Sequence, residues 1–210
     1  MAVVMALGAG VLVSSVAFEL MDEGYKIGGL DAAAPGLLLG AAVFYLADRE
    51  VNRRGGERRK NSGGWQGGSA TAIAIGALLD GIPESASIGI GLIEGEGVGI
   101  ALVAAVFLSN VPEGLSSAAG MRRAGRSPTY MLGLWGAVTL ASTLAALLGY
   151  LFLDGASGNV VAFIQSLAAA AVLTMLASTM MPEAYEEGGP VVGIVTTVGF
   201  LLAFVLSRVA

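Results

Sequence analysis

Seven apolar stretches, separated by short polar segments, follow one another along the chain. Their approximate ranges are 3–23, 31–48, 69–93, 97–121, 129–153, 160–184 and 189–208. A helix of about 20 apolar residues crosses the hydrocarbon core of a bilayer, and each stretch is close to this length. The pattern predicts an all-α fold: a polytopic transmembrane helical bundle of about seven helices that forms one domain over residues 1–210.

Two connecting segments carry most of the positive charge. The Gly-rich loop at about 49–68 and the segment 122–126 hold nine of the eleven Lys and Arg residues. With seven crossings these two segments lie on the same side, and an excess of Lys and Arg marks the cytoplasmic side of a membrane protein. We therefore expect basic cytoplasmic loops, an N-terminus inside and a C-terminus outside.

The composition agrees with a membrane protein and excludes several kinds of chemistry. Hydrophobic residues make up 55% of the chain and charged residues 13%, with a mean hydropathy of +0.78, whereas a soluble domain carries about 25% charged residues. The chain has no Cys and no His, so disulfides, thiolate or imidazole metal sites and His-based catalysis are excluded. We expect a non-enzyme with no bound cofactor, with membrane lipid but no nucleic acid as a partner.

Two polar runs interrupt the third and fourth apolar stretches. They cover residues 79–85 (LDGIPES) and 108–114 (LSNVPEG), and they align without a gap 29 residues apart. Ionisable groups at this depth are costly and usually mark the path of an ion or proton. The two helices run in opposite directions, as in transporters with inverted repeats, whose substrate site lies where the repeats meet. A weaker match pairs residues 9–25 with 170–186.

The polar side chains of each run share a face of their helix. Asp80 and Glu84 are four residues apart, so their carboxylates project from one face, one turn apart. On the next helix Asn110 and Glu113 are three residues apart, and Ser109 is one turn from Glu113. Adjacent antiparallel helices can therefore bring three carboxylates, an amide oxygen and a hydroxyl to a common point.

Three carboxylates this close repel one another and cannot all be ionised without a countercharge. Neither run contains Lys or Arg, so a bound divalent cation is the simplest countercharge. Prolines in both runs also free the carbonyls of Leu79 and Leu108, and such carbonyls at membrane depth line a cavity or bind an ion. Oxygen ligands suit Mn²⁺, Mg²⁺ or Ca²⁺, and Fe²⁺ and Zn²⁺ also accept carboxylates. The predicted metal ligands are Asp80, Glu84, Ser109, Asn110 and Glu113.

The residues alone leave two other interpretations open. A proton-coupled carrier of a non-metal solute would use the same carboxylates as a proton relay. A membrane subunit without transport activity would use them only to specify helix assembly. Outside the two runs, Glu19 is either a further ligand or a side chain that reaches the membrane interface. Acidic residues at the ends of the stretches, Glu183 among them, are expected to be solvated.

The two runs resemble motifs of the ZIP (Zrt/Irt-like protein) family of divalent-metal transporters. That family has eight helices, with a His-Asn-x-Pro-Glu-Gly type motif on the fourth helix and a related motif on the fifth. The sequence DGIPES at 80–85 has Asp and Gly in the His and Asn positions, and SNVPEG at 109–114 matches the bacterial form of the second motif. The segment 180–184 (MMPEA) is similar to part of the family's seventh helix. The match starts at the family's second helix, so the first is lacking from this form or lies before Met1.

The resemblance implies a divalent metal ion such as Zn²⁺, Fe²⁺ or Mn²⁺ as the substrate. It also implies alternating access, in which one helix bundle moves relative to another. An inner or plasma membrane of a prokaryote is the expected location, and a homodimer is left open.

The resemblance also implies roles for the candidate ligands. Carried over by position, Asp80, Glu84 and Glu113 fall on the family's primary metal site, whereas Ser109 and Asn110 fall on its edge. A second metal in this family needs further ligands, and the corresponding positions here are occupied by residues without a carboxylate. These positions are Gly81 and Ser142. We therefore expect one bound metal rather than two.

Overall fold

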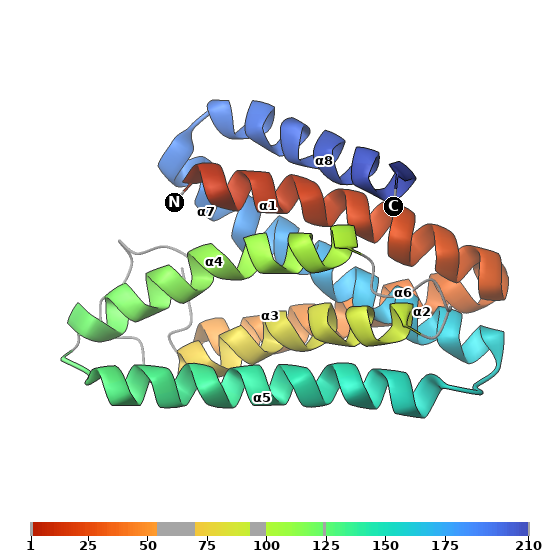
Figure 1. Ribbon diagram of the computed structural model, residues 1–210, viewed down its shortest axis with the longest axis horizontal. Coiled ribbons are helices and arrows are strands. Elements are labelled where there is room, and N and C mark those ends of the chain that lie inside the picture. Colours follow the sequence, from red (N-terminus) through yellow and green to blue (C-terminus); the bar gives the residue numbers. More distant parts are fainter. Residues whose placement is uncertain (1, 54–69, 93–99, 124, 210) are drawn as a thin grey trace.

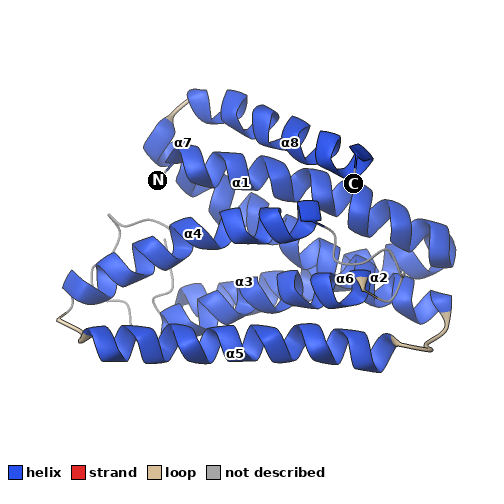
Figure 2. Ribbon diagram, in the orientation of Figure 1, coloured by secondary structure: helices blue, strands red, loops and turns tan. Residues whose placement is uncertain are grey.

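The chain folds into a bundle of long helices, seen here in a computed structural model (Figure 1). The structure describes residues 2–53, 70–92, 100–123 and 125–209. Every regular element in these ranges is a helix, as Figure 2 shows, so the predicted all-α fold is confirmed. The helices in chain order are α1 (Ala2–Ser15), η1 (Val16–Met21), α2 (Asp22–Val51), α3 (Ala70–Gly91), α4 (Ile100–Arg123), α5 (Pro128–Leu153), α6 (Gly158–Met175), η3 (Leu176–Met180), α7 (Met181–Gly188) and α8 (Val191–Val209).

Four helical stretches of the described chain are long and apolar enough to cross a membrane. They are Ala2–Val51, Pro128–Leu153, Gly158–Gly188 and Val191–Arg208. The first has 50 residues, or about 75 Å at 1.5 Å per residue, more than twice the hydrocarbon thickness of a bilayer. It reverses direction partway, and its two halves run antiparallel (Figure 1). The protein is therefore an integral membrane helical bundle.

The helices α3 and α4 belong to the same bundle. They have 22 and 24 residues, and they run antiparallel to each other alongside the other helices (Figure 1). Within the described residues, all seven predicted apolar stretches coincide with helical segments. The predicted basic loop at 49–68 lies mostly outside the described residues.

A glycine turns the chain back at the end of the first crossing. Gly29 has φ 67° and ψ −175°, a backbone conformation that is essentially restricted to glycine. Gly189 ends α7 in nearly the same conformation, with φ 62° and ψ −155°. A residue with a Cβ would be strained at either place. These two glycines therefore define where the chain leaves one crossing and starts the next.

The backbone follows the same course, that is, the same succession of conformations, in two parts of the chain: residues 2–29 and 158–189. In each, a helix passes through a short π turn, continues as a helix and ends at a left-handed glycine. The two π turns, η1 and η3, begin 160 residues apart, and so do Gly29 and Gly189. The sequence match of 9–25 with 170–186 has an offset of 161 and is therefore one residue out of this structural register. The shared course supports an internal repeat.

Three pairs of helices pack closely along their length: α1 with α8, α2 with α6, and α3 with α5. In the second pair, Gly36 and Gly40 lie directly against the backbone carbonyls of Phe163 and Leu167. Small residues allow such close approach, which replaces the hydrophobic effect as a driving force inside a bilayer. The helix α4 packs on α1 and crosses α3. It is the helix that brings the second polar run to the first.

The two chain termini lie at opposite ends of the bundle (Figure 1). The helices α2 and α4 end, and α5 begins, at the end where the N-terminus lies. Three of the described basic residues flank these helix ends: Arg53, Arg122 and Arg126. The two connecting segments that carry most of the Lys and Arg residues therefore start or end at the same end of the bundle.

Candidate functional site

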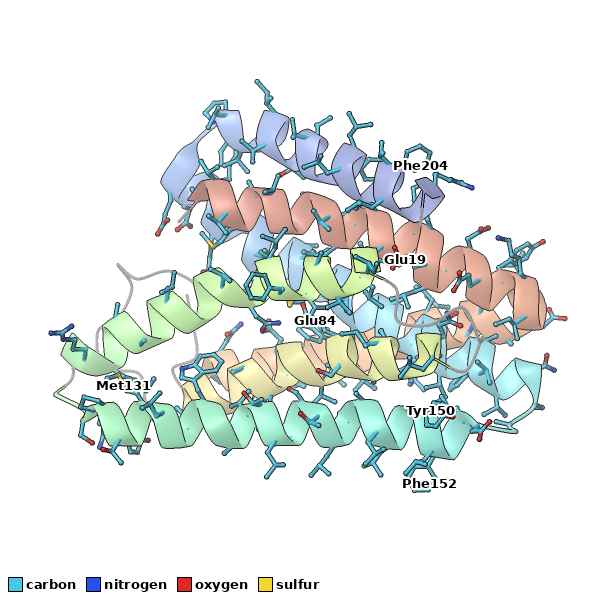
Figure 3. The ribbon with its side chains drawn as sticks, in the orientation of Figure 1. Glu19, Glu84, Met131, Tyr150, Phe152 and Phe204 are labelled. Carbon is cyan, nitrogen blue, oxygen red and sulfur yellow. The ribbon has the colours of Figure 1, made fainter. Side chains whose placement is uncertain are left out.

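A buried carboxylate lies between α3 and α4. Glu84 on α3 is 1% exposed, and Figure 3 shows it in the interior of the bundle between these two helices. A charged group at this depth requires partners, because burial without compensation costs several kcal/mol. One partner comes from the facing helix: Asn110 on α4 donates a hydrogen bond from Nδ2 to Glu84 Oε2 at 3.1 Å. The two polar runs therefore meet, as predicted.

The amide of Asn110 has a defined orientation. Its nitrogen donates both to Glu84 Oε2 and to the carbonyl oxygen of Val106, at 3.1 and 2.7 Å. Both partners are acceptors, so the NH₂ group must face them, and its two N–H bonds are then both used. The amide oxygen is left as the group that can accept a hydrogen bond or coordinate a cation. Asn110 can thus hold Glu84 in place and offer an oxygen ligand at once.

The other predicted ligands lie on the same two helices. Asp80 is one turn before Glu84 on α3, and Ser109 and Glu113 flank Asn110 on α4. Their side chains are outside the described part of the structure, so their positions as ligands stay a prediction. Among the described residues, no three acidic, His or Cys side chains lie close enough together to hold a metal ion. The side chains of Asp80 and Glu113 are not among those described.

The helix around Glu84 is locally adapted to its proline. Pro83 lies inside α3 and has no N–H, so the carbonyl of Leu79 loses its usual helical partner. The buried hydroxyl of Ser87 donates to the Pro83 carbonyl at 2.9 Å. On α4, the carbonyl of Leu108 lies against α1, where a Cβ added to Gly8 would be 3.2 Å from it. The Leu108 carbonyl therefore lies in the contact between α4 and α1.

A cavity of about 480 Å³ adjoins the Glu84–Asn110 pair between α3, α4 and α5. Asn110 lines it from α4, and α5 contributes the hydroxyls of Thr139, Ser142 and Thr143. Thr139 and Thr143 donate to carbonyls one turn back on their own helix, so their oxygens remain available as acceptors. The cavity is thus a partly polar space, large enough for a hydrated cation, beside the buried carboxylate.

Gly81 and Ser142 face each other across the contact of α3 with α5. A Cβ added to Gly81 would be 3.1 Å from Ser142 Oγ. These are the two positions where the ZIP resemblance expects ligands of a second metal. Glycine offers no ligand and serine only a neutral hydroxyl.

Two features of the interior were not found by the sequence patterns. Glu183 on α7 is 6% exposed, so the expectation that it is solvated is wrong. It lies one turn after buried Thr179 and shares its inward face, whereas Glu186 and Glu187 are exposed. The four-residue spacing of Thr179 and Glu183 is the signal that could have indicated this. The second feature is the π turn η1, for which hydrophobicity gives no signal.

The chain is similar to a plant protein over most of its length. No family model matches the chain. Over 190 residues the chain is 26% identical to an Arabidopsis thaliana protein named "putative zinc transporter", and the match covers 88% of this chain and 30% of that protein. The chain thus spans less than a third of the length of this relative.

Proposed function

We propose that this protein transports divalent metal cations across a membrane and that the ions bind between α3 and α4. The observation that carries the proposal is the Glu84–Asn110 pair: a carboxylate 1% exposed in a membrane bundle, joined across two antiparallel helices by a 3.1 Å hydrogen bond. Intramembrane carboxylates of this kind mark ion pathways. The similarity to a plant protein named as a zinc transporter supports a metal as the ion.

The proposed ligands divide by role. Asp80, Glu84 and Glu113 supply negative charge that a divalent cation neutralises, and the cation in turn removes their mutual repulsion. Asn110 supplies its amide oxygen and orients Glu84 through its NH₂ group. Ser109 adds a neutral oxygen. Such a set has only oxygen donors, which suit Mn²⁺ and also accept Fe²⁺ and Zn²⁺.

We further propose that the protein is of the ZIP type and binds one metal at a time. The antiparallel helices with Pro-Glu runs, and the backbone course that α1–η1–α2 shares with α6–η3–α7, support the first part. The second part is supported by Gly81 and Ser142, which face each other without a carboxylate between them. The end of the bundle where α2 and α4 finish is proposed to face the cytoplasm of a prokaryotic cell.

Metal-dependent thermal stability of the purified protein tests the proposal. Wild type, Glu84→Ala and Glu113→Ala are compared in Zn²⁺, Mn²⁺, Fe²⁺, Co²⁺, Cd²⁺ and Mg²⁺. A ligand at 100 times its Kd stabilises the folded state by about 2.7 kcal/mol. We expect stabilisation by some of these ions in wild type and its loss in both variants. Asp31→Ala, which removes an exposed carboxylate of α2, serves as the matched control and should behave as wild type.

The result also separates the alternatives. Flux of the stabilising ion into proteoliposomes should follow, and it should be lost in the same variants. If no ion stabilises wild type and a pH gradient alone drives solute uptake, the carboxylates are a proton relay and the metal proposal is wrong. If Glu84→Gln and Glu113→Gln retain full function, neither carboxylate is a ligand.

A further inference from the structure

Two buried side-chain oxygens of α6 face Gly24 in the first crossing. Gln165 is 1% exposed and Ser166 is fully buried. Neither Gln165 Oε1 nor Ser166 Oγ has a hydrogen-bond partner among the described residues. A Cβ added to Gly24 would lie 3.3 Å from Ser166 Oγ and 3.8 Å from Gln165 Oε1. Both oxygens are therefore directed at one point beside the Gly24 backbone.

The orientation of the Gln165 amide is set by its nitrogen. Its Nε2 donates a hydrogen bond at 3.3 Å to the carbonyl oxygen of Glu19, the residue of the turn η1 that is labelled in Figure 3. Because an amide nitrogen only donates, the atom that faces Gly24 is the acceptor oxygen. The carbonyl oxygen of Ala162 is 3.6 Å from the same point. An amide, a hydroxyl and a carbonyl oxygen, all uncharged, therefore surround it.

The internal repeat contains a second contact with the same backbone geometry. With the offset of 160 residues, the contact of Gly28 with Ala162 corresponds to the contact of Gly188 with Ala2. A Cβ added to either glycine would overlap the methyl group of its alanine, at 2.5 and 2.8 Å. The first crossing packs on α6 near Gly24 in the way that α7 packs on α1 at the corresponding place.

The chemistry of these two contacts differs. The residues that correspond to Gly24, Gln165 and Ser166 at this offset are Ala184, Met5 and Ala6. All three are fully buried, and none of their side chains requires a hydrogen bond. In one contact a methyl group thus packs among apolar side chains. In the other, glycine replaces the alanine exactly where two polar side chains need partners, which indicates a ligand that bonds to them.

We propose that a buried water molecule binds beside Gly24 and joins Gln165 Oε1 to Ser166 Oγ. Buried polar groups without hydrogen bonds are costly, and a water with two to four polar partners commonly satisfies them inside proteins. The water donates to Gln165 Oε1 and to the Ala162 carbonyl and accepts from the Ser166 hydroxyl, so each group has a partner of the right kind. Three uncharged oxygens suit water better than a divalent cation, which takes carboxylates and about six ligands.

This site is separate from the proposed metal site. It lies between the first crossing and α6, next to the π turn η1, whereas the Glu84–Asn110 pair lies between α3 and α4. The water joins the first crossing to α6, and the corresponding contact of α7 with α1 is apolar. The inference therefore does not depend on the transport of any metal.

Nuclear magnetic resonance can detect the water directly. The chain has two glutamines, Gln66 and Gln165, so a Gln66→Ala background with ¹⁵N-labelled glutamine has a single side-chain amide. A water bound to Gln165 Oε1 lies close to one N–H of this amide. We expect a rotating-frame Overhauser cross-peak to water, whose sign distinguishes it from proton exchange. Gly24→Ala should abolish the cross-peak, and Gly133→Ala, which adds a methyl group in open space on α5, should retain it.

Unfolding measurements test the same site independently. Gly24→Ala brings a methyl group against Ser166 Oγ and displaces the water, so two buried oxygens lose their partner. Relative to Gly133→Ala, which has the same gain in helix propensity, its unfolding equilibrium constant should rise about tenfold. Adding the residues of the apolar contact, Gln165→Met and Ser166→Ala, should recover most of this stability.

The other outcomes overturn the proposal. If wild type gives no cross-peak, or if Gly24→Ala retains it, no water binds beside Gly24. If NaCl stabilises wild type more than choline chloride does, and Gly24→Ala removes the difference, the ligand is a monovalent cation. Equal unfolding constants of Gly24→Ala and Gly133→Ala would show that the two oxygens need no partner. Should Gly24→Ala not fold, Ser166→Ala removes one partner of the water, and an undiminished cross-peak in that variant would exclude the proposed bridge.

Discussion

The amide of Asn110 on α4 donates to the carboxylate of Glu84 on α3 across 3.1 Å. These residues are 26 positions apart in the chain and belong to two polar runs that align with each other. Each run alone is a costly interruption of an apolar helix. Together they form a paired site at the crossing of two antiparallel helices.

Changing Asn110 should separate its two roles. Asn110→Ala removes a hydrogen bond to a buried carboxylate, which costs about 1.5–3 kcal/mol of folding free energy, and it should weaken metal binding about tenfold or more. Asn110→Asp places a second carboxylate against Glu84, so the metal-free protein should be destabilised and the divalent cation should stabilise it by a larger increment than wild type. Melting temperatures with and without Mn²⁺ measure both effects. Equal metal-dependent shifts in all three proteins would contradict this role.

Replacing Glu84 by Gln should separate folding from ion binding. The Glu84→Gln variant keeps a side-chain oxygen that can accept the Asn110 hydrogen bond, so it should fold with a similar melting temperature in the absence of metal. It lacks the charge, and metal-dependent stabilisation and flux should be lost. Glu84→Ala should lose both metal response and stability. Retained flux in Glu84→Gln would exclude a ligand role for this carboxylate.

Filling the cavity beside the site should slow transport. Ser142→Leu adds bulk to the cavity of about 480 Å³ between α3, α4 and α5, so the rate of flux should fall while Glu84 remains able to bind metal. Ala137→Leu adds bulk to an exposed position of α5 and is the matched control. Transport rates and metal affinities are compared in proteoliposomes and in detergent. A rate equal to wild type in Ser142→Leu would show that ions do not use this cavity.

The reversal at Gly29 should tolerate no side chain. Its φ of 67° and ψ of −175° lie in a region open essentially to glycine, and a Cβ there would meet no atom within 4 Å. Gly29→Ala should therefore cost about 1–3 kcal/mol through backbone strain alone. Gly133→Ala, in an α-helix and also with open space around it, should be neutral or stabilising. Unfolding free energies in mixed micelles would give the comparison, and equal values would contradict the strain.

Much of the fold could be predicted from the order of apolar and polar residues. The length of the stretches identifies the crossings, because a bilayer requires about 20 apolar residues in a helix and satisfies no backbone group outside one. The Pro-Glu runs also identified Glu84 and Asn110 as partners, since an aligned pair of costly polar segments in adjacent antiparallel helices has to meet. The approximate positions of the helices and the pairing of the site's two described residues follow from local pattern.

Other features depended on contacts between distant parts of the chain. Hydrophobicity could not indicate that Glu183 is buried, since its exposure depends on which face of α7 packs inward. The π turn η1 has an ordinary apolar composition (VAFELM), and its contacts with α6 and α8 arise only from the packing of helices that are far apart in the chain. The hydrogen bond from Gln165 Nε2 to the carbonyl oxygen of Glu19 joins a side chain to a backbone group 146 positions away, and a backbone group has no residue type that a sequence pattern could detect.

The sequence by itself determined that this is a helical membrane protein with a carboxylate-bearing pair of helices, because the cost of burying charge in lipid leaves few alternatives. Only the tertiary structure decided how α4 is held. It packs on α1, and its middle meets Glu84 through Asn110. Both contacts depend on the rotation and crossing of packed helices. Those quantities are set by side-chain packing between segments far apart in the chain, which no local pattern records.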